Sequence, residues 1–239
     1  SIIDSHAHFN DHRFDDCREE LLGRMNELGV RKIINCGCDF ETIEEVLALG
    51  RKYPFCFSAV GFHPENIGDE LPDFAALDRI IKENDKIVAV GETGLDYAST
   101  TSREAQRKLF DLHLQAAARL GKPVVIHNVK ATDDVLRILG NYPTIRKVVF
   151  HGFIGSVQMA DSILRRGYYL SFGDRSLRSP RTREVIATME IRRLFVETDD
   201  NPNLEIEEVY NEVAKLRNMS VETLADEIDK NYEIFFAKD

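Results

Sequence analysis

The chain has 239 residues, of which 43% are hydrophobic and 30% are charged. This composition excludes an intrinsically disordered chain, a collagen-like repeat and a bundle of membrane spans. The balance of 41 Asp and Glu against 31 Lys and Arg gives a formal net charge of -10, which argues against a protein that coats nucleic acid non-specifically.

Eight short apolar runs punctuate the chain. They are mostly continuous and rich in β-branched or aromatic residues, as is typical of strands buried on both faces of a parallel sheet. They lie near residues 2–4, 32–36, 55–60, 87–90, 123–127, 147–151, 168–172 and 194–198.

Amphipathic helical patterns fill the intervals between these runs. The first covers residues 17–29 and ends at Gly29, a residue that favours helix C-termini. The further helices are predicted at 42–52, 73–84, 102–120, 132–140, 156–166, 180–190, 204–217 and 220–237.

Eight strand–helix units followed by one more helix predict an α/β fold, a (β/α)8 TIM barrel with an extra C-terminal helix. We expect residues 1–239 to form a single domain. A doubly wound open sheet is the alternative, although no G-x-G-x-x-G follows the first strand. No segment approaches 18 consecutive apolar residues and no signal peptide is evident, so we expect a cytoplasmic protein with no membrane partner.

The four cysteines are too few for a disulfide framework in a chain of this length. Cys36 and Cys38 are two positions apart in a strand-like run, so both should face the same side. We interpret them as buried thiols in preference to metal ligands.

Histidines gather where the predicted strands end. His6, His8, His63, His127 and His151 all fall at or just after the C-terminal end of a strand, the edge that forms the catalytic face of a barrel. In an extended segment the first two project to the same side. The remaining histidines, at positions 12 and 113, lack this placement and are interpreted as solvated or packing side chains.

Carboxylates follow other strands at the same edge. Glu92 and Asp96 follow the fourth strand, and Glu197 and Asp199 follow the eighth. The four imidazoles of His6, His8, His127 and His151, together with two or three of these carboxylates, are more than one tetrahedral ion needs. They suit a pair of divalent cations bridged by one carboxylate. For any one of these residues, the alternative is a strand-end polar group that hydrogen-bonds a loop.

Six segments together resemble a known family. They are IIDSHAHFN at the start, GFHPE at 61–65, VGETGLDY at 90–97, KPVVIH at 122–127, HGFIGS at 151–156 and VETD at 196–199. In this order, and over nearly the whole chain, the sequence resembles the TatD-type metal-dependent deoxyribonucleases, a branch of the amidohydrolase-like barrels.

The resemblance implies a metal-dependent hydrolase that uses two divalent metal ions, Mg²⁺, Mn²⁺ or Zn²⁺. Glu92 would bridge the two ions, and Asp199 would also take a proton from the attacking water. The implied metal ligands are His6, His8, Glu92, His127, His151 and Asp199.

The resemblance also implies which residues act on the substrate. Glu92, Asp199 and His63 would be the catalytic residues, with His63 touching the substrate or leaving group. The basic side chains of Arg175 and Arg178 are further candidates for the rim. Beside His63, the sequence itself offers residues at or after strand ends for the rim, although solvated loop side chains are the alternative. The expected substrate-binding residues are His63, Asp96, Tyr97, Lys130 and Phe153.

Two departures from the family pattern leave the substrate open. Val129 stands where the family usually has an arginine, and Asp200 follows Asp199 in a shortened, acidic segment. The first hypothesis is a phosphodiesterase acting on DNA ends, like a 3'-5' exonuclease. The alternatives are an enzyme that hydrolyses a small-molecule amide, ester or lactone, and a non-catalytic metal-binding barrel.

Overall fold

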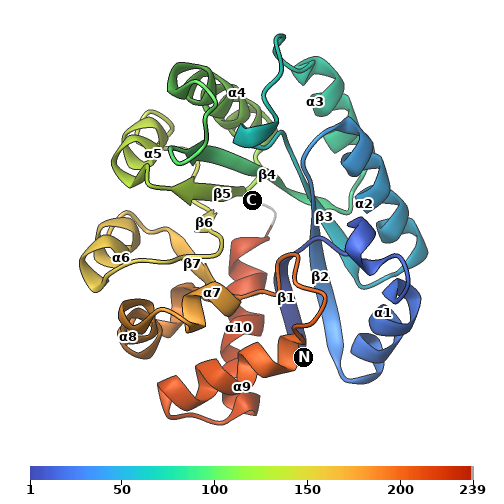
Figure 1. Cartoon of the computed structure of the whole chain (residues 1–239), viewed down its shortest axis with the longest axis vertical. Coiled ribbons are helices and arrows are strands. Elements are labelled where there is room, and N and C mark those ends of the chain that lie inside the picture. The colour runs from blue at the N-terminus through green and yellow to red at the C-terminus, as the bar shows by residue number, and fades with distance from the viewer. Residues whose placement is uncertain (238–239) are drawn as a thin grey trace.

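The computed structural model describes residues 1–237, so the last two residues of the predicted barrel lie outside the described part. Eight parallel strands follow one another in sequence order around one sheet (Figure 1). This arrangement confirms the predicted TIM barrel and excludes the open doubly wound sheet. The strands are β1 (Ile2–Ala7), β2 (Val30–Gly37), β3 (Cys56–Val60), β4 (Ile87–Asp96), β5 (Val124–Val129), β6 (Val148–Phe150), β7 (Tyr169–Phe172) and β8 (Leu194–Val196).

Helices surround the strands, and the predicted ones are found with ends shifted by a few residues. One short helix was missed, α7, because its four residues are too few to show a helical period. The helices are α1 (Arg18–Glu27), α2 (Phe40–Lys52), α3 (Phe74–Glu83), α4 (Arg103–Leu120), α5 (Thr132–Leu139), α6 (Val157–Leu164), α7 (Asp174–Leu177), α8 (Pro180–Thr188), α9 (Ile206–Arg217) and α10 (Val221–Phe235).

The barrel closes between β1 and the segment after β8. The amide of Asp199 donates to the carbonyl of His6 at 2.9 Å, and the amide of His8 donates to the carbonyl of Asp199 at 3.2 Å. Below this point the buried carboxylate of Asp4 accepts hydrogen bonds from the amide and the hydroxyl of Thr198. Closure therefore fixes the backbone of three residues at the catalytic edge.

The extra C-terminal helix, α10, lies against the opposite end of the barrel. The Asn231 side chain donates to the carbonyls of Ile191 and Leu194, where β8 begins. The ring of Phe235 packs on those of Tyr169 and Phe195. This end is filled by the helix, which leaves the C-terminal edge of the strands as the open one.

Within residues 1–237, no helix has both the length and the apolar character needed to cross a bilayer.

Candidate metal centre

An irregularity in β4 places Glu92 at the centre of the catalytic edge. Three steps along β4, from Val90 to Thr93, pair with only two along β5, so the strand carries a bulge there. Gly91 and Gly94 take positive φ angles of 146° and 143°. A Cβ on Gly94 would lie only 2.0 Å from the carbonyl oxygen of His127, so glycine permits the close approach of β4 to β5.

The first ligand group joins the two ends of the barrel sheet. His6 Nε2 lies 3.2 Å from His8 Nε2, 3.4 Å from Glu92 Oε2 and 3.4 Å from Asp199 Oδ1. His8 Nε2 lies 3.6 Å from the same Glu92 oxygen and 3.2 Å from the same Asp199 oxygen. The two imidazole nitrogens thus each lie within 3.6 Å of the same two carboxylate oxygens.

The second ligand group uses the other oxygen of Glu92. Glu92 Oε1 lies 2.9 Å from His127 Nδ1, 2.8 Å from His151 Nε2 and 3.3 Å from His63 Nε2. The ring of His151 also stacks on that of His6, with centroids 3.8 Å apart. The structure therefore brings all six predicted ligands, and His63 with them, into one cluster.

Burial and opposite charges shift the pKa values within this cluster. Burial opposes ionisation of Glu92, but neighbouring His151 and His127 outweigh it and hold the pKa of Glu92 well below its usual range. Burial likewise works against a charged His8, yet the neighbouring carboxylates of Asp199 and Glu92 raise its pKa to about 10. The carboxylates of the cluster are therefore stabilised by positive charge beside them. Bound divalent cations can supply that charge.

The donor atoms fit divalent cations. Ligand atoms around a tetrahedral ion with bonds near 2.1 Å lie about 3.4 Å apart, close to the separations within the first group. Imidazole nitrogens with carboxylate oxygens form a donor set that accepts Zn²⁺ or Mn²⁺, and the carboxylates also suit Mg²⁺. Three overlapping groups could each hold an ion, and Glu92 belongs to two of them: His6, His151 and Asp199; His6, His8 and Glu92; His63, Glu92 and His127.

Comparison with known proteins identifies the family. The family model described as TatD related DNase matches residues 3–237. The chain belongs to this family. It is 29% identical to the uncharacterized metal-dependent hydrolase YabD of Bacillus subtilis, over 98% of each chain. The crystal structure of YjjV, a TatD homolog from Escherichia coli, superposes with a TM-score of 0.89 at 30% identity, covering 100% of this chain and 98% of that one.

A relative with a named activity also matches. The 3'-5' ssDNA/RNA exonuclease TatD of Erwinia tasmaniensis is 30% identical over 78% of this chain and 74% of its own length. These matches confirm the predicted enzyme class: the protein is a TatD-family metal-dependent hydrolase.

Buried groups behind the ligands fix their orientation in this TatD-family site. Asp96 Oδ2 lies 2.9 Å from His127 Nε2, and its other oxygen accepts from the amides of Ala98 and Ser99. Glu197 Oε1 lies 3.2 Å from His151 Nδ1. Such partners set which ring nitrogen carries the proton and so which one faces a metal.

The sequence did not assign these supporting roles. Asp96 was predicted to bind substrate, but the structure places its carboxylate on His127. Cys36, expected only as a buried thiol, has its sulfur 3.4 Å from His6 Nδ1. Alternation offers a signal for Asp96, because positions 92 and 96 share one face of β4. Contacts between different strands or strand ends, such as those of Cys36 with His6 and Glu197 with His151, leave no such local pattern.

The other predicted substrate residues lie in different environments. Lys130 is exposed and directly follows β5, with a φ of 53°. Tyr97 is half-buried, and its hydroxyl donates to Asp134. Phe153 is only 4% exposed and packs against Phe172, so its side chain lies in the core and not on the rim.

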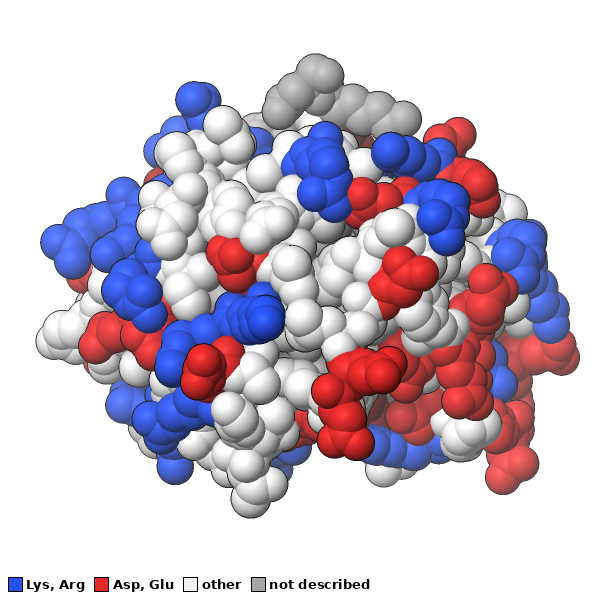
Figure 2. Space-filling view, turned by 90° about the horizontal axis from the view of Figure 1, so that it is seen from above, with Lys and Arg blue, Asp and Glu red and all other residues white. Residues whose placement is uncertain are grey.

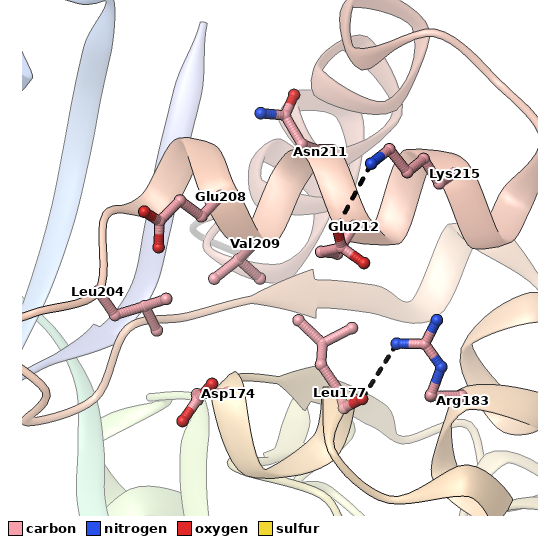
Figure 3. A pocket seen from close by; sticks show the side chains of 9 residues that line it. All are labelled: Asp174, Leu177, Arg183, Leu204, Glu208, Val209, Asn211, Glu212 and Lys215. Carbon is pink, nitrogen blue, oxygen red and sulfur yellow. Dashed lines mark hydrogen bonds and ion pairs between the residues drawn. The ribbon is translucent and has the colours of Figure 1, made fainter.

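A separate pocket of about 460 Å³ lies between α7, α8 and α9 (Figure 3). Its walls mix apolar side chains such as Leu177 and Leu204 with charged ones, and Glu212 pairs with Lys215 within it. None of the predicted site residues lines it. Arg175 and Arg178, the predicted rim residues, sit on or beside α7 and are exposed, with Arg178 paired to Asp174.

Proposed function

We propose that this TatD-family hydrolase is a two-metal phosphodiesterase that removes nucleotides from the 3' ends of single-stranded DNA. One observation carries the proposal: the two oxygens of Glu92 face two different sets of ligand atoms. Two neighbouring ions would share a carboxylate whose two oxygens face separate ligand sets.

The chemistry of a phosphodiester needs such a centre. The ester is anionic and hydrolyses slowly, so charge neutralisation is the main requirement. Two divalent cations, when bound, supply positive charge to the attacking and leaving oxygens and lower the pKa of an attacking water. An acidic chain can hold a phosphate in this way although its own net charge is -10.

The exposure of Asp199 supports a role for it as the general base. Its side chain is 42% exposed, whereas that of Glu92 is 5% exposed, so only Asp199 is open to a water arriving from solvent. Its backbone is fixed by the closure of the barrel. We assign to its carboxylate the acceptance of the proton that the attacking water loses.

The hydrogen bonding of His63 supports a role for it as a hydrogen-bond donor to substrate. Its Nδ1 accepts a hydrogen bond from the amide of Glu65 at 3.1 Å, so in the neutral ring the proton sits on Nε2. That nitrogen points toward Glu92 at 3.3 Å. The ring can donate to a phosphate oxygen or to the leaving oxygen, as the resemblance implied.

We infer the direction in which the strand is digested from a relative with a named activity. The Erwinia TatD protein is named as a 3'-5' ssDNA/RNA exonuclease, and it shares 30% of aligned residues with this chain. This likeness supports the same direction of digestion here.

The experiment uses protein stripped of metal and reloaded with Mg²⁺, Mn²⁺ or Zn²⁺. We expect hydrolysis of bis(p-nitrophenyl) phosphate and stepwise shortening of a 5'-labelled single-stranded oligonucleotide from its 3' end. A 3'-labelled copy should release its label in the first step. Hydrolysis of amide or lactone substrates, with neither diester cleaved under any of the three ions, would overturn the proposal.

A further inference from the structure

Charge is divided unevenly between two sectors of the barrel. Residues 38–86, between β2 and β4, contain eleven Asp and Glu against five Lys and Arg. Residues 97–147, between β4 and β6, contain nine Lys and Arg against four Asp and Glu. Figure 2 shows Asp and Glu gathered at the lower right and Lys and Arg prevailing at the left, the side on which Figure 1 places α5, α6 and α8, with α4 nearer the middle.

The basic sector reaches the metal centre at Tyr97. This residue directly follows Asp96, the partner of His127, and its amide donates to the carbonyl of Val129. Lys130 is the next residue along that chain segment. The end of β4 and the end of β5 therefore bring Tyr97 and Lys130 to the edge of the cluster.

Two arginines of α4 rest on the same tyrosine. The guanidinium of Arg103 lies over the ring, 4.3 Å from its centroid. Arg107 donates to the tyrosine hydroxyl at 3.1 Å, and Asp134 accepts from that hydroxyl. Asp134 partly neutralises Arg107, at 3.9 Å. Over residues 1–237, neither Arg103 nor Lys130 forms an ion pair, and both are exposed.

We propose that Tyr97, Arg103, Arg107 and Lys130, which we call the Tyr97 surface, bind single-stranded nucleic acid beside the reacting ester. This inference rests on the proposed function and adds the path of the substrate. A polyanion whose end lies at the metals is repelled by the sector of α2 and α3 and attracted over α4 and α5. Charge complementarity thus selects one direction for the strand.

The geometry favours a single strand over a duplex. One face of the Arg103 guanidinium is taken by Tyr97, and the exposed side chain leaves the other face for an unstacked base. Lys130 supplies a point charge for a phosphate. The overall charge of -10 limits the contact to a short stretch near the reacting end, because no long basic track is present in the sequence.

The test removes the two unpaired charges with little change in side-chain length. The double variant Arg103→Gln, Lys130→Gln is compared with Arg79→Gln, Lys82→Gln, which removes one exposed Arg and one exposed Lys from α3 in the acidic sector. The probe is a fluorescein-labelled oligothymidine of about twelve nucleotides, capped against hydrolysis by a 3' phosphorothioate. Binding is measured by fluorescence anisotropy at 50 mM and 200 mM salt.

Loss of the phosphate contact assigned to Lys130 should lower the salt slope by about 0.7, the contribution of one contact on a single strand. We therefore expect the loss of affinity between the two salt concentrations to be about 2.6-fold smaller for the basic-sector variant. The α3 variant should match the wild type. Equal slopes in all three proteins, or no binding by the wild type, would overturn the Tyr97 surface.

Measurements of turnover distinguish a failure of the Tyr97 surface from a failure of the proposed function. Hydrolysis of bis(p-nitrophenyl) phosphate needs no extended strand, so the basic-sector variant should lose less kcat/KM with this ester than with an uncapped oligonucleotide, and the α3 variant should keep both values within about twofold. The KM of the basic-sector variant for an uncapped oligonucleotide should rise about tenfold. A wild type that cleaves the oligonucleotide and a variant with unchanged KM would refute the surface alone. A wild type that binds the capped strand but cleaves neither diester would refute the proposed function alone.

Discussion

The metal cluster has two sides that come from different parts of the barrel. One side takes His127 and His151 from β5 and the end of β6, and the other takes His6 from β1 and Asp199 from the segment after β8. On the first side each imidazole has a carboxylate behind it, Asp96 or Glu197. On the second, the group behind His6 is the thiol of Cys36.

The two sides also differ in how their backbone is held. On the β5 side the Gly94–Asp96 segment of β4 pairs in continuous register with β5, and residues 94 to 96 lie opposite 127 to 129. On the other side Asp199 lies outside any strand, at a φ of 58°, and joins β1 by an isolated bridge. Carboxylate-backed ligands on regular strands are better oriented, so we expect the β5 side to hold its ion more tightly.

Glu92→Gln tests what the two sides share and should have the largest effect. The substitution keeps the shape of the side chain but removes the charge that both ligand groups use. We expect kcat for bis(p-nitrophenyl) phosphate to fall by more than about a thousandfold, roughly 4 kcal/mol in activation free energy. Elemental analysis should show fewer than two ions per chain, whereas two ions in the folded variant would exclude Glu92 as a bridge.

His113→Gln tests a histidine that supports the cluster without joining it. Its Nε2 accepts from the amide of Phe62, next to His63, and its Nδ1 donates to the carbonyl of Leu109. Burial lowers the pKa of His113 from 6.5 to about 4. The unfolded chain therefore binds this proton first as the pH falls from 6.5 towards 4, and the folded protein loses stability in that window.

The variant lacks this titration, so the stability gap between the two proteins should narrow on acidification. Between pH 7 and pH 5 we expect it to shrink by about 2 kcal/mol, measured by urea unfolding of metal-free protein. A gap that stays constant would show that His113 takes up its proton equally readily in the folded and the unfolded chain. The part of the stability gap that does not change with pH measures the contribution of the hydrogen bond from the Phe62 amide to His113.

Glu197→Gln tests the support of the β5 side. The amide keeps one oxygen for His151 Nδ1 but gives up the negative charge, and changes of this kind cost about 10–100-fold in metal affinity. We expect one of two ions to be lost more readily in competition with a chelator, with the other unaffected. Loss of both ions in parallel would contradict a separate β5 side.

Much of this centre could be predicted from the sequence because it is local. Strand ends in a barrel converge, so the position of His127 or His151 after an apolar run already implies the shared edge. Glu92 was identified for the same reason. The prediction ended β4 at residue 90, however, whereas the strand runs to Asp96, since the glycines at 91 and 94 read as a turn and not as a bulge.

The supporting residues could not be predicted, because their partners come from distant parts of the chain. Cys36 meets His6 across 30 positions and Glu197 meets His151 across 46. Phe153 shows the opposite case, a residue whose local position misled the prediction. Its place after a strand suggested that its side chain lies on the rim, yet the side chain packs on Phe172 in the core. A side chain at a strand end can turn either way, and only tertiary packing decides.

Cys36→Ala tests the weaker support and should have the smallest effect. A thiol sulfur is a poor acceptor for the His6 Nδ1 proton, so its removal should change the affinity for either ion by less than about threefold. Cys56→Ala, which removes another fully buried thiol at the start of β3, controls for the packing cost of the missing sulfur. A loss of metal affinity in Cys36→Ala as large as in Glu197→Gln, with none in Cys56→Ala, would show that the sulfur orients His6 as firmly as a carboxylate orients His151, and the two sides would then be equally supported.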